Sequence, residues 1–138
     1  MAITEHRMRL AEERDLPRLR EIAAEAFGAA APDLASLVGQ ESLYVAAWRT
    51  SIDGFVVLMP LKDALLVQRL AVAEEARRRG IGSWLLDCAA MHARNLNLRA
   101  IELQMPEHDP ARLAWLARLG FVPQRQGGNR TYLRKLLD

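Results

Sequence analysis

The spacing of hydrophobic residues predicts a strand and then a helix at the start of the chain. Apolar and polar side chains alternate over Thr4–Leu10, which is typical of a β-strand with one buried face. Asp15 followed by Pro17 is typical of a helix N-cap with proline in the first turn, so we predict a helix over about 15–27. Its apolar residues recur every three or four positions, as on one face of a helix, and they are Leu16, Leu19, Ile22, Ala23, Ala26 and Phe27.

The middle of the chain has three strand-like segments. They follow a short helical turn that is predicted over about 32–38. Ser42–Trp48 and Ile52–Met59 are rich in Val, Tyr, Phe and Trp and are predicted to be strands joined by a tight connection. Ala64–Ala73 is a nearly continuous apolar strand, and the large polar pair Gln68-Arg69 interrupts it.

The second half alternates helices with strands. The predicted elements are a helix over about 82–96, a strand over Ala100–Met105, a helix from Asp109-Pro110 to Gly120, and the strands Phe121–Gln124 and Thr131–Leu137 around the turn Gly127–Asn129. Because strands lie on both sides of a helix in this order, the sequence predicts an α/β or α+β sheet with helices packed on its faces.

Length and composition favour one soluble domain. A chain of 138 residues has the size of a single domain, 1–138. The most apolar stretches, 54–61 and 64–73, are about half as long as a membrane span, and the first residues show no secretory signal. The single cysteine, Cys88, cannot form an internal disulfide, and no Cys/His cluster suggests a metal site. We therefore expect a cytoplasmic protein without a metal cofactor.

The charge pattern argues against a general nucleic-acid-binding surface. The net charge is only +2, although the pI is about 9.1. Acidic residues are frequent in the first helix, which does not suit a broad basic surface. All but two of the 19 cationic residues are arginine, the exceptions being Lys62 and Lys135. Among these arginines, the consecutive run Arg77-Arg78-Arg79 stands out because of its context in the chain.

The segment Arg77–Gly82 has the features of an anion-binding loop. It joins the end of the apolar strand to the next helix, whose first turn has unpaired N–H groups and a partial positive charge. Glycines let an anion approach the backbone, and three guanidinium groups add positive charge. The segment lacks the Lys and Ser/Thr of a nucleoside-triphosphate P-loop and does not fit G-x-G-x-x-G, so those motifs do not predict ATP or NAD here. A solvated basic helix N-terminus is the alternative.

These residues resemble the R/Q-x-x-G-x-G/A signature of the GCN5-related N-acetyltransferase (GNAT) family. They follow Leu70-Ala71-Val72, which is similar to the strand end that precedes the signature in that family. Asp53–Val56 and Leu119–Phe121 also sit where the family has such residues, and the resemblance covers nearly the whole chain. It implies a central mixed, mostly antiparallel sheet, splayed in the middle between the strands 64–73 and 100–105 and flanked by helices.

The resemblance implies that acetyl-CoA lies in the opening of that sheet. The backbone of Leu70, Ala71 and Val72 would pair with the pantetheine arm, as an added strand would. The side chains of Arg77, Arg78 and Arg79 would be auxiliary contacts, some of them to the adenosine phosphate. The pyrophosphate would be held by the backbone amides of Arg78, Arg79, Gly80, Ile81, Gly82 and Ser83.

The chain departs from the family pattern at the general acid. Many members carry Asn-x-x-Ala-x-x-x-Tyr before the final Gly-Phe, and the tyrosine protonates the departing CoA thiolate. That spacing falls here on Leu116, which has no proton to donate, and the asparagine position falls on Asp109, which also suits a helix N-cap. The replacement would be Tyr132, Tyr44, Cys88 or water, and we predict Tyr132.

The general base must take a proton from the acceptor ammonium, and Glu102 is the predicted candidate. It shares a strand face with Gln104, and some relatives place a catalytic glutamate on this strand. An alignment without gaps puts Gln104 there instead, and Glu102 could equally face solvent. His108 is a further candidate in the following loop. One residue of Gln68-Arg69 is expected either to bind a carboxylate of the acceptor or to pair with a carboxylate across the sheet.

The resemblance leads to an acetyl-CoA-dependent N-acetyltransferase. It would transfer an acetyl group to a primary amine of a small molecule or peptide by direct attack in a ternary complex, because no nucleophile arrangement is evident. The alternative is an acyl-CoA-binding or regulatory module that has lost turnover. We expect neither nucleic acid nor membrane as a partner. The sequence leaves open the amine and the oligomeric state, although homodimers through the last strands are common among such relatives.

Overall fold

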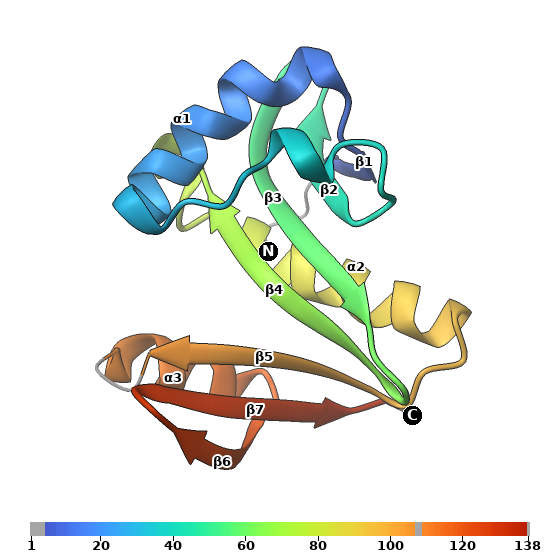
Figure 1. Ribbon diagram of the computed structural model, residues 1–138, viewed down its shortest axis with the longest axis vertical. Helices are drawn as coiled ribbons and strands as arrows, with labels where there is room; N and C mark the ends of the chain where they lie inside the picture. Colours follow the sequence, from blue (N-terminus) through green and yellow to red (C-terminus); the bar gives the residue numbers. More distant parts are fainter. Residues whose placement is uncertain (1–4, 107–108, 138) are drawn as a thin grey trace. The chain divides into compact units, whose positions relative to one another are not determined.

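The computed structural model describes residues 5–106 and 109–137, which form a sheet flanked by helices (Figure 1). Its strands are β1 (Arg7–Leu10), β2 (Leu43–Trp48), β3 (Ser51–Pro60), β4 (Ala64–Val72), β5 (Ala100–Pro106), β6 (Val122–Gly127) and β7 (Arg130–Leu136). The α-helices are α1 (Leu16–Phe27), α2 (Ile81–Asn95) and α3 (Pro110–Arg118). The sheet has seven strands in the order β1-β2-β3-β4-β5-β7-β6, which confirms the predicted fold class.

The sheet is mixed, as predicted. β1 with β2, β2 with β3, β5 with β7 and β6 with β7 pair antiparallel, whereas β4 and β5 run parallel. The parallel ladder joins Ala64–Val67 to Ala100–Leu103. The ladder between β2 and β3 contains a bulge, because Ala46 lies opposite Gly54 while Ala47 lies opposite Ile52. One residue of β3, Asp53, is therefore additional, and a bulge of this kind takes backbone groups out of the regular ladder.

The chain packs as two compact units. The first unit consists of Met1–Leu58 and Arg69–Cys88, and the second of Met59–Gln68 and Ala89–Asp138. β3, β4 and α2 each contribute residues to both units.

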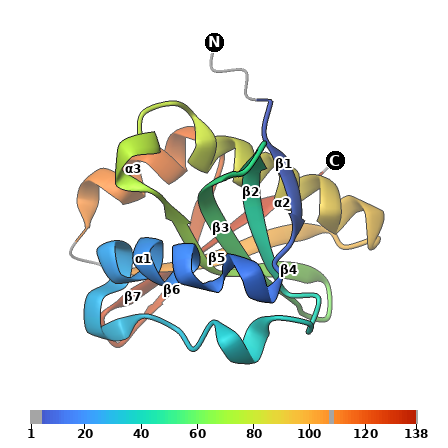
Figure 2. The same ribbon diagram turned by 90° about the horizontal axis from the view of Figure 1, so that it is seen from above.

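In the first unit, α1 and the first turns of α2 cover opposite faces of the strands (Figure 2). Successive residues of a strand point to opposite faces, and β3 shows this at Gly54 and Phe55. The Phe55 ring lies 6.3 Å from that of Phe27 in α1, between ring centroids. On the other face, a Cβ at Gly54 would lie 3.4 Å from Leu85 of α2. Phe55 and Leu85 are fully buried, so the strands are packed from both sides.

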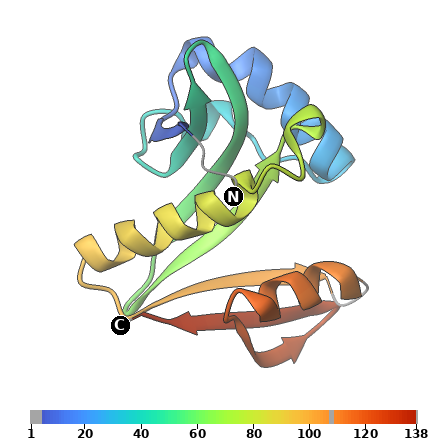
Figure 3. The same ribbon diagram turned by 180° about the vertical axis from the view of Figure 1, so that it is seen from behind.

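In the second unit, α3 covers one face of the strands β5, β6 and β7 (Figure 3). The residues of this core are fully or almost fully buried. They are Ile101 and Leu103 of β5, Leu133 of β7, Leu116 of α3, and Phe121, which follows the helix. The alternate residues of β5 and β7 face away from this core and are mostly polar. This second face carries both predicted catalytic residues.

The two predicted helix caps have different outcomes. Asp109 caps α3 as predicted, because its carboxylate accepts a hydrogen bond from the Arg112 amide at 3.2 Å. Asp15 occupies the N-cap position of α1, but its side chain makes no cap hydrogen bond. It accepts instead from two nitrogens of Arg9, at 2.8 and 3.1 Å, and from the Glu12 amide at 2.8 Å. A bidentate guanidinium is the stronger partner for a carboxylate, so Asp15 takes the predicted N-cap position, with Pro17 in the first turn, but without the side-chain cap hydrogen bond.

The predicted boundaries agree with the structure except in the last hairpin and at the start. β6 extends to Gly127, whereas the prediction ended this strand at Gln124. Every residue of β6 is exposed, so no alternation of buried and polar residues marks its length. β1 starts at Arg7, and the predicted start at Thr4 lies outside the described residues. No helix in the described part of the chain is long and apolar enough to cross a membrane.

Candidate functional site

The connection between β4 and α2 has a backbone conformation suited to an anion. The chain leaves β4 through the short 3-10 turn η4 (Glu74–Ala76) and then forms the exposed segment Arg77–Gly80. Arg78 and Gly80 both have positive φ, 67° and 80°. Glycine adopts this conformation freely, but for arginine it is uncommon and costs energy. Left-handed residues beside right-handed ones turn successive N–H groups toward one point, which makes an anion-binding concavity.

The first turn of α2 adds further donors to this segment. The Trp84 amide donates to the Gly80 carbonyl at 2.9 Å, so the helical hydrogen bonds begin there. The amides of Ile81–Ser83 precede that bond and lie in the turn where a helix offers its own N–H groups no acceptor. The side chain of Ile81 is buried, which fixes the start of the helix against the core. A continuous stretch of backbone thus presents donors at the positive end of α2.

The end of β4 is held tightly against β3. The Ala73 amide donates to the Asp53 carbonyl at 2.8 Å. A Cβ at Gly54 would lie 2.7 Å from the Ala71 carbonyl oxygen, a distance that real Cβ atoms do not tolerate. Only glycine at this position lets β3 approach the last residues of β4 so closely. The strand that leads into the loop therefore has a defined position.

Arg77 folds back onto that strand. Its Nε donates a hydrogen bond to the Val72 carbonyl at 3.2 Å. Arginine has five N–H donors, so this bond leaves the Nη1 and Nη2 ends of the same side chain for other acceptors. Val72 is one of the residues predicted to pair with pantetheine, and Arg77 is one of the predicted auxiliary contacts. The structure thus brings two predicted cofactor residues together.

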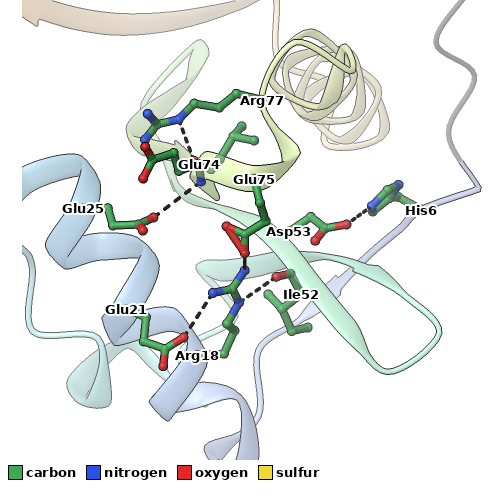
Figure 4. Close-up of polar contacts among 10 residues, drawn as sticks. His6, Arg18, Glu21, Glu25, Ile52, Asp53, Glu74, Glu75 and Arg77 are labelled. Carbon is green, nitrogen blue, oxygen red and sulfur yellow. Dashed lines mark hydrogen bonds and ion pairs between the residues drawn. The ribbon is translucent and has the colours of Figure 1, made fainter.

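Arg18 of α1 connects three segments of the first unit (Figure 4). Its Nε donates to the Ile52 carbonyl at 3.1 Å, Nη1 to Glu21 at 3.1 Å and Nη2 to Glu75 at 2.5 Å. Ile52 lies at the bulge of β3 and Glu75 in η4. Partial burial lowers the pKa of Arg18, but the hydrogen bonds to Glu75 and Glu21 together with the charges of these carboxylates outweigh it, so that the pKa is raised. This network connects α1 to the start of the loop.

A second contact joins α1 to η4. The Glu74 amide lies 3.5 Å from a carboxylate oxygen of Glu25 in α1, at the limit of a hydrogen bond (Figure 4). The sequence did not indicate Arg18, Glu25 or Glu75 as site residues. Arg18 and Glu75 are 57 positions apart, so no local spacing signals their contact. Only the packing of α1 beside η4 reveals it.

In the second unit, Glu102 is bound by an arginine. Glu102 lies opposite Arg134 in the β5–β7 ladder, and its Oε2 accepts a hydrogen bond from Arg134 at 2.5 Å. Arg134 also binds Asp63, at 3.0 Å. The hydrogen bond from Arg134 lowers the pKa of the Asp63 carboxyl. Glu102 is therefore placed in an ion-pair network, half-buried on the polar face of β5.

Tyr132 lies on the same face. It stands opposite Gln104, two residues along from the pair of Glu102 and Arg134. The Arg125 guanidinium of β6 lies over its ring, 4.2 Å from the centroid, in a cation–π contact. The two predicted catalytic side chains thus share one face of the second unit, where arginines contact both.

The other candidates have more restricted settings. Leu116, at the family's tyrosine position, is buried in the core of the second unit. Burial is the main cause that raises the pKa of both Tyr44 and Cys88. In the first unit the Arg69 guanidinium lies 5.6 Å from the Phe27 ring centroid. His108 lies outside the described residues.

Gln68, the other polar residue of β4, and the expectation about metals are the remaining points. In the second unit, the amide nitrogen of Gln68 lies 4.0 Å from the Met59 sulfur. Within residues 5–106 and 109–137, no group of three or more His, Cys, Asp or Glu side chains is placed to hold a metal ion.

Comparison with solved structures shows the same fold. Ard1 from Thermoplasma volcanium superposes with a TM-score of 0.83 at 20% identity, covering 97% of this chain and 99% of that one. The ribosomal-protein-S18-alanine N-acetyltransferase from Escherichia coli gives 0.79 at 18% identity, covering 95% and 93%. The PaiA N-acetyltransferase from Thermoplasma acidophilum, in complex with coenzyme A, gives 0.78 at 15%, covering 97% and 100%.

Comparison of the sequence identifies the family. No curated protein gives a significant match to the chain. Residues 39–123, more than half of the chain, match the model of the Acetyltransferase (GNAT) domain. The matched region includes β2 to α3 and with them the whole segment from Leu70 to Ser83. The chain therefore belongs to the GNAT acetyltransferase family.

Proposed function

We propose that the protein is an acetyl-CoA-dependent N-acetyltransferase that acetylates a primary amine of a small molecule or peptide. The observation that carries the proposal is the loop before α2, where Arg78 and Gly80 with positive φ lead into a helix N-terminus. This conformation concentrates backbone donors and positive charge at one point. A diphosphate is the group of coenzyme A that such a point would bind.

Each part of the coenzyme has a proposed partner within the first unit. The amides of Arg78–Ser83 bind the pyrophosphate, and the backbone of Leu70–Val72 pairs with the pantetheine arm. The close packing of Gly54 on Ala71 supports this role, because it holds that backbone in one position. Arg77 is fastened to Val72 through Nε and offers its remaining donors to a phosphate. Arg78 and Arg79 are exposed and supply further positive charge.

The reaction forms a C–N bond, breaks a C–S bond and moves protons at nitrogen and sulfur. A base takes one proton from the acceptor ammonium, the freed nitrogen lone pair attacks the thioester carbon, and the C–S bond breaks while the nitrogen gives its second proton to solvent. The leaving thiolate then takes a proton from an acid. We assign the base to Glu102 and the acid to Tyr132, which share one face of the second unit. Because Arg134 binds Oε2 of Glu102, the proton is taken by Oε1 or after that ion pair opens.

Catalysis of this kind depends largely on positioning. Holding the amine beside the thioester makes the attack effectively intramolecular. Backbone N–H groups near Val72 would polarise the thioester carbonyl and stabilise the oxyanion that develops. A direct transfer in a ternary complex requires no covalent enzyme intermediate.

One observation favours a second function. The position that carries the acid tyrosine in many members of the family is Leu116, and its side chain is 1% exposed. A protein that kept the coenzyme site but lost this acid would act as an acyl-CoA-binding or regulatory module. Binding of acetyl-CoA is common to both functions, whereas release of CoA with an acetylated product belongs only to the enzyme.

Isothermal titration with acetyl-CoA tests the proposed site. The wild type is expected to bind in the micromolar range, and the double variant Arg78→Glu with Gly80→Asp to lose binding. The matched control is Arg118→Glu with Gly127→Asp, which makes the same charge changes at exposed positions of the second unit. If the folded wild type does not bind, the proposed function is wrong. If it binds, mass spectrometry of an amine panel distinguishes the enzyme from the binding module.

A further inference from the structure

Arg18 contacts the turn that leads into the proposed coenzyme loop. It lies on α1, yet its three groups of donors reach β3, a neighbouring turn of its own helix and η4. The side chain is 31% exposed, so it is anchored at the edge of the core. The anchor is the Ile52 carbonyl at the bulge of β3, where the regular ladder is interrupted. Arg18 thus has a fixed position from which to hold Glu75.

The loop itself carries charges of both signs side by side. Glu74 and Glu75 come directly before Ala76, and Arg77, Arg78 and Arg79 follow it. An anion that binds here must compete with these two carboxylates for the three guanidinium groups. The carboxylates would therefore weaken anion binding unless other groups occupy them.

α1 binds the carboxylate of one of these residues and only the backbone amide of the other. Glu75 binds Arg18, and the backbone amide of Glu74 faces Glu25 (Figure 4). The pKa of Glu75 is lowered first by its own backbone amide and then by the hydrogen bond from Arg18, with smaller contributions from the charges of Arg18 and Arg77. Glu75 thus lies within electrostatic reach of two cations, one on α1 and one in the loop. Without Arg18, the remaining cation is Arg77.

We propose that Arg18 is a positioning residue for the CoA site. By binding Glu75, Arg18 keeps that carboxylate from pairing with the loop arginines that would bind the phosphates. The inference rests on the proposed coenzyme site. It assigns a function in coenzyme affinity to a residue of α1, an element outside the loop. The matching requirement is that Glu75 is harmful to binding only when Arg18 is absent.

The shape of the network explains why the residue is an arginine. A guanidinium group holds a backbone carbonyl with Nε while its two Nη atoms hold two carboxylates, and the planar fork keeps the three directions fixed. A lysine ammonium at this position carries the charge but not the fork. Arg18→Lys is therefore expected to bind CoA more weakly than the wild type but more tightly than Arg18→Gln.

The test compares four variants by isothermal titration with CoA. Arg18→Gln should weaken binding about tenfold, the scale of one uncompensated charge near an anion at a protein surface. Glu75→Gln should bind CoA about as tightly as the wild type, because Arg18 already holds that carboxylate in the wild type. The double variant Arg18→Gln with Glu75→Gln should regain an affinity within about twofold of Glu75→Gln. Arg20→Gln, an exposed change on the same helix, is the matched control and should leave affinity unchanged.

A second measurement separates positioning from a merely structural role. The single variant Arg18→Gln and the double variant both lose the bridge to Glu75, so thermal unfolding should show similar stability for the two. Only their affinities for CoA should differ. The difference between Arg18→Gln and the wild type should also shrink at high salt, because screening weakens the competition for the arginines.

Three outcomes would overturn the inference. The double variant could bind as weakly as Arg18→Gln, which would show that the bridge acts through structure alone. Glu75→Gln by itself could weaken binding as much as Arg18→Gln, with the same meaning. Finally, the folded wild type could fail to bind CoA, which would overturn the proposed function together with this inference. In the first two outcomes the wild type still binds, so only the role of Arg18 is lost.

Discussion

The two units of the molecule use their charged residues in different ways. In the first unit, charged side chains join separate segments, as in the ion pairs of Arg9 with Asp15 and of Arg18 with Glu75 and in the hydrogen bond between His6 and Asp53. In the second unit, residues 110–137 contain six cationic and no acidic residues, and Arg134 binds two carboxylates from elsewhere in that unit. Of the contacts in the first unit, the pair of Arg18 and Glu75 reaches η4, which leads into the proposed coenzyme loop.

This difference between the two units predicts which substitutions each unit should tolerate. A change that shifts the backbone near the end of β4 should damage the first unit, because several elements meet there. The polar face of the second unit should accept similar changes with little loss of stability. Activity, in contrast, should depend on that face if the proposed catalytic residues are correct.

The largest expected effect is on a glycine of the first unit. Gly54→Ala places a Cβ 2.7 Å from the Ala71 carbonyl oxygen, so one strand must move. We expect a loss of about 3 kcal/mol in the free energy of unfolding, at the upper end of overpacking effects, together with weaker CoA binding. Urea unfolding and titration measure the two quantities.

The matched control is a glycine of the second unit. At Gly127 a Cβ would meet its nearest neighbour, an atom of the Tyr132 ring, at an ordinary 3.8 Å. Gly127→Ala should change stability by less than about 1 kcal/mol, since it mainly restricts the unfolded chain. Equal losses for the two variants would show that the units do not differ in this respect.

The elements with strong local signals could be predicted from the sequence. The apolar spacing of α1 and the cap at Asp109 are contained in short segments, and both were found in the structure. The end of β6 was missed because its residues are all exposed and leave no pattern. Asp15 holds the predicted N-cap position of α1, but its side chain binds Arg9 of β1, a partner that local spacing does not indicate.

The residues of the candidate site also fall into those that a local motif indicates and those that it does not. The residues proposed to bind CoA form one continuous segment with a motif, so the sequence could indicate them. The contact of Arg18 with Glu75 depends on the packing of α1, and the contact of Glu102 with Arg134 on the register of β5 and β7. Contacts of this kind need the tertiary structure. Neither spacing nor composition predicts them.

The ion pair of Glu102 with Arg134 is either structural, like those of the first unit, or part of catalysis. If Glu102 is the base, Glu102→Gln should lower kcat/KM about 100-fold, the usual range for loss of a general base, with CoA affinity unchanged. Asp63→Asn is the control, because it removes the other carboxylate partner of Arg134 and should leave activity within a few-fold. Activity of Glu102→Gln close to the wild type would assign the residue to structure alone.

A smaller effect is expected from the buried carboxylate of the first unit. Asp15 is 6% exposed and accepts hydrogen bonds from Arg9 and from the Glu12 amide. Asp15→Asn should cost about 2 kcal/mol at neutral pH, as for hydrogen bonds to a charged group. The hydrogen bond from Arg9 is the largest cause that lowers the pKa of Asp15 in the folded protein.

The pH dependence of that variant has a defined sign. Because the folded pKa lies below the unfolded value of about 3.9, the carboxylate stabilises the fold above that pH. Its contribution is lost as the pH falls through the folded pKa. The difference between wild type and Asp15→Asn should therefore be constant from neutral pH down to mildly acidic pH and then shrink. Unfolding curves over this range measure it, and a difference that grows on acidification would contradict the assignment.

The smallest expected effects are those of two exposed arginines, one in each unit. The two substitutions should change the free energy of unfolding in opposite directions. Arg130 lies on the same face of β7 as Tyr132 and Arg134, in the segment without acidic residues, so Arg130→Gln should relieve repulsion and add up to about 0.5 kcal/mol. Arg14 binds Glu12 at 2.6 Å but is 75% exposed, so Arg14→Gln should cost no more than about 0.5 kcal/mol. Both differences should disappear at high salt, because screening acts on exposed charges of either sign. Chemical unfolding at low and high salt measures them. The same sign for both variants would mean that the excess of cations does not set the behaviour of the second unit.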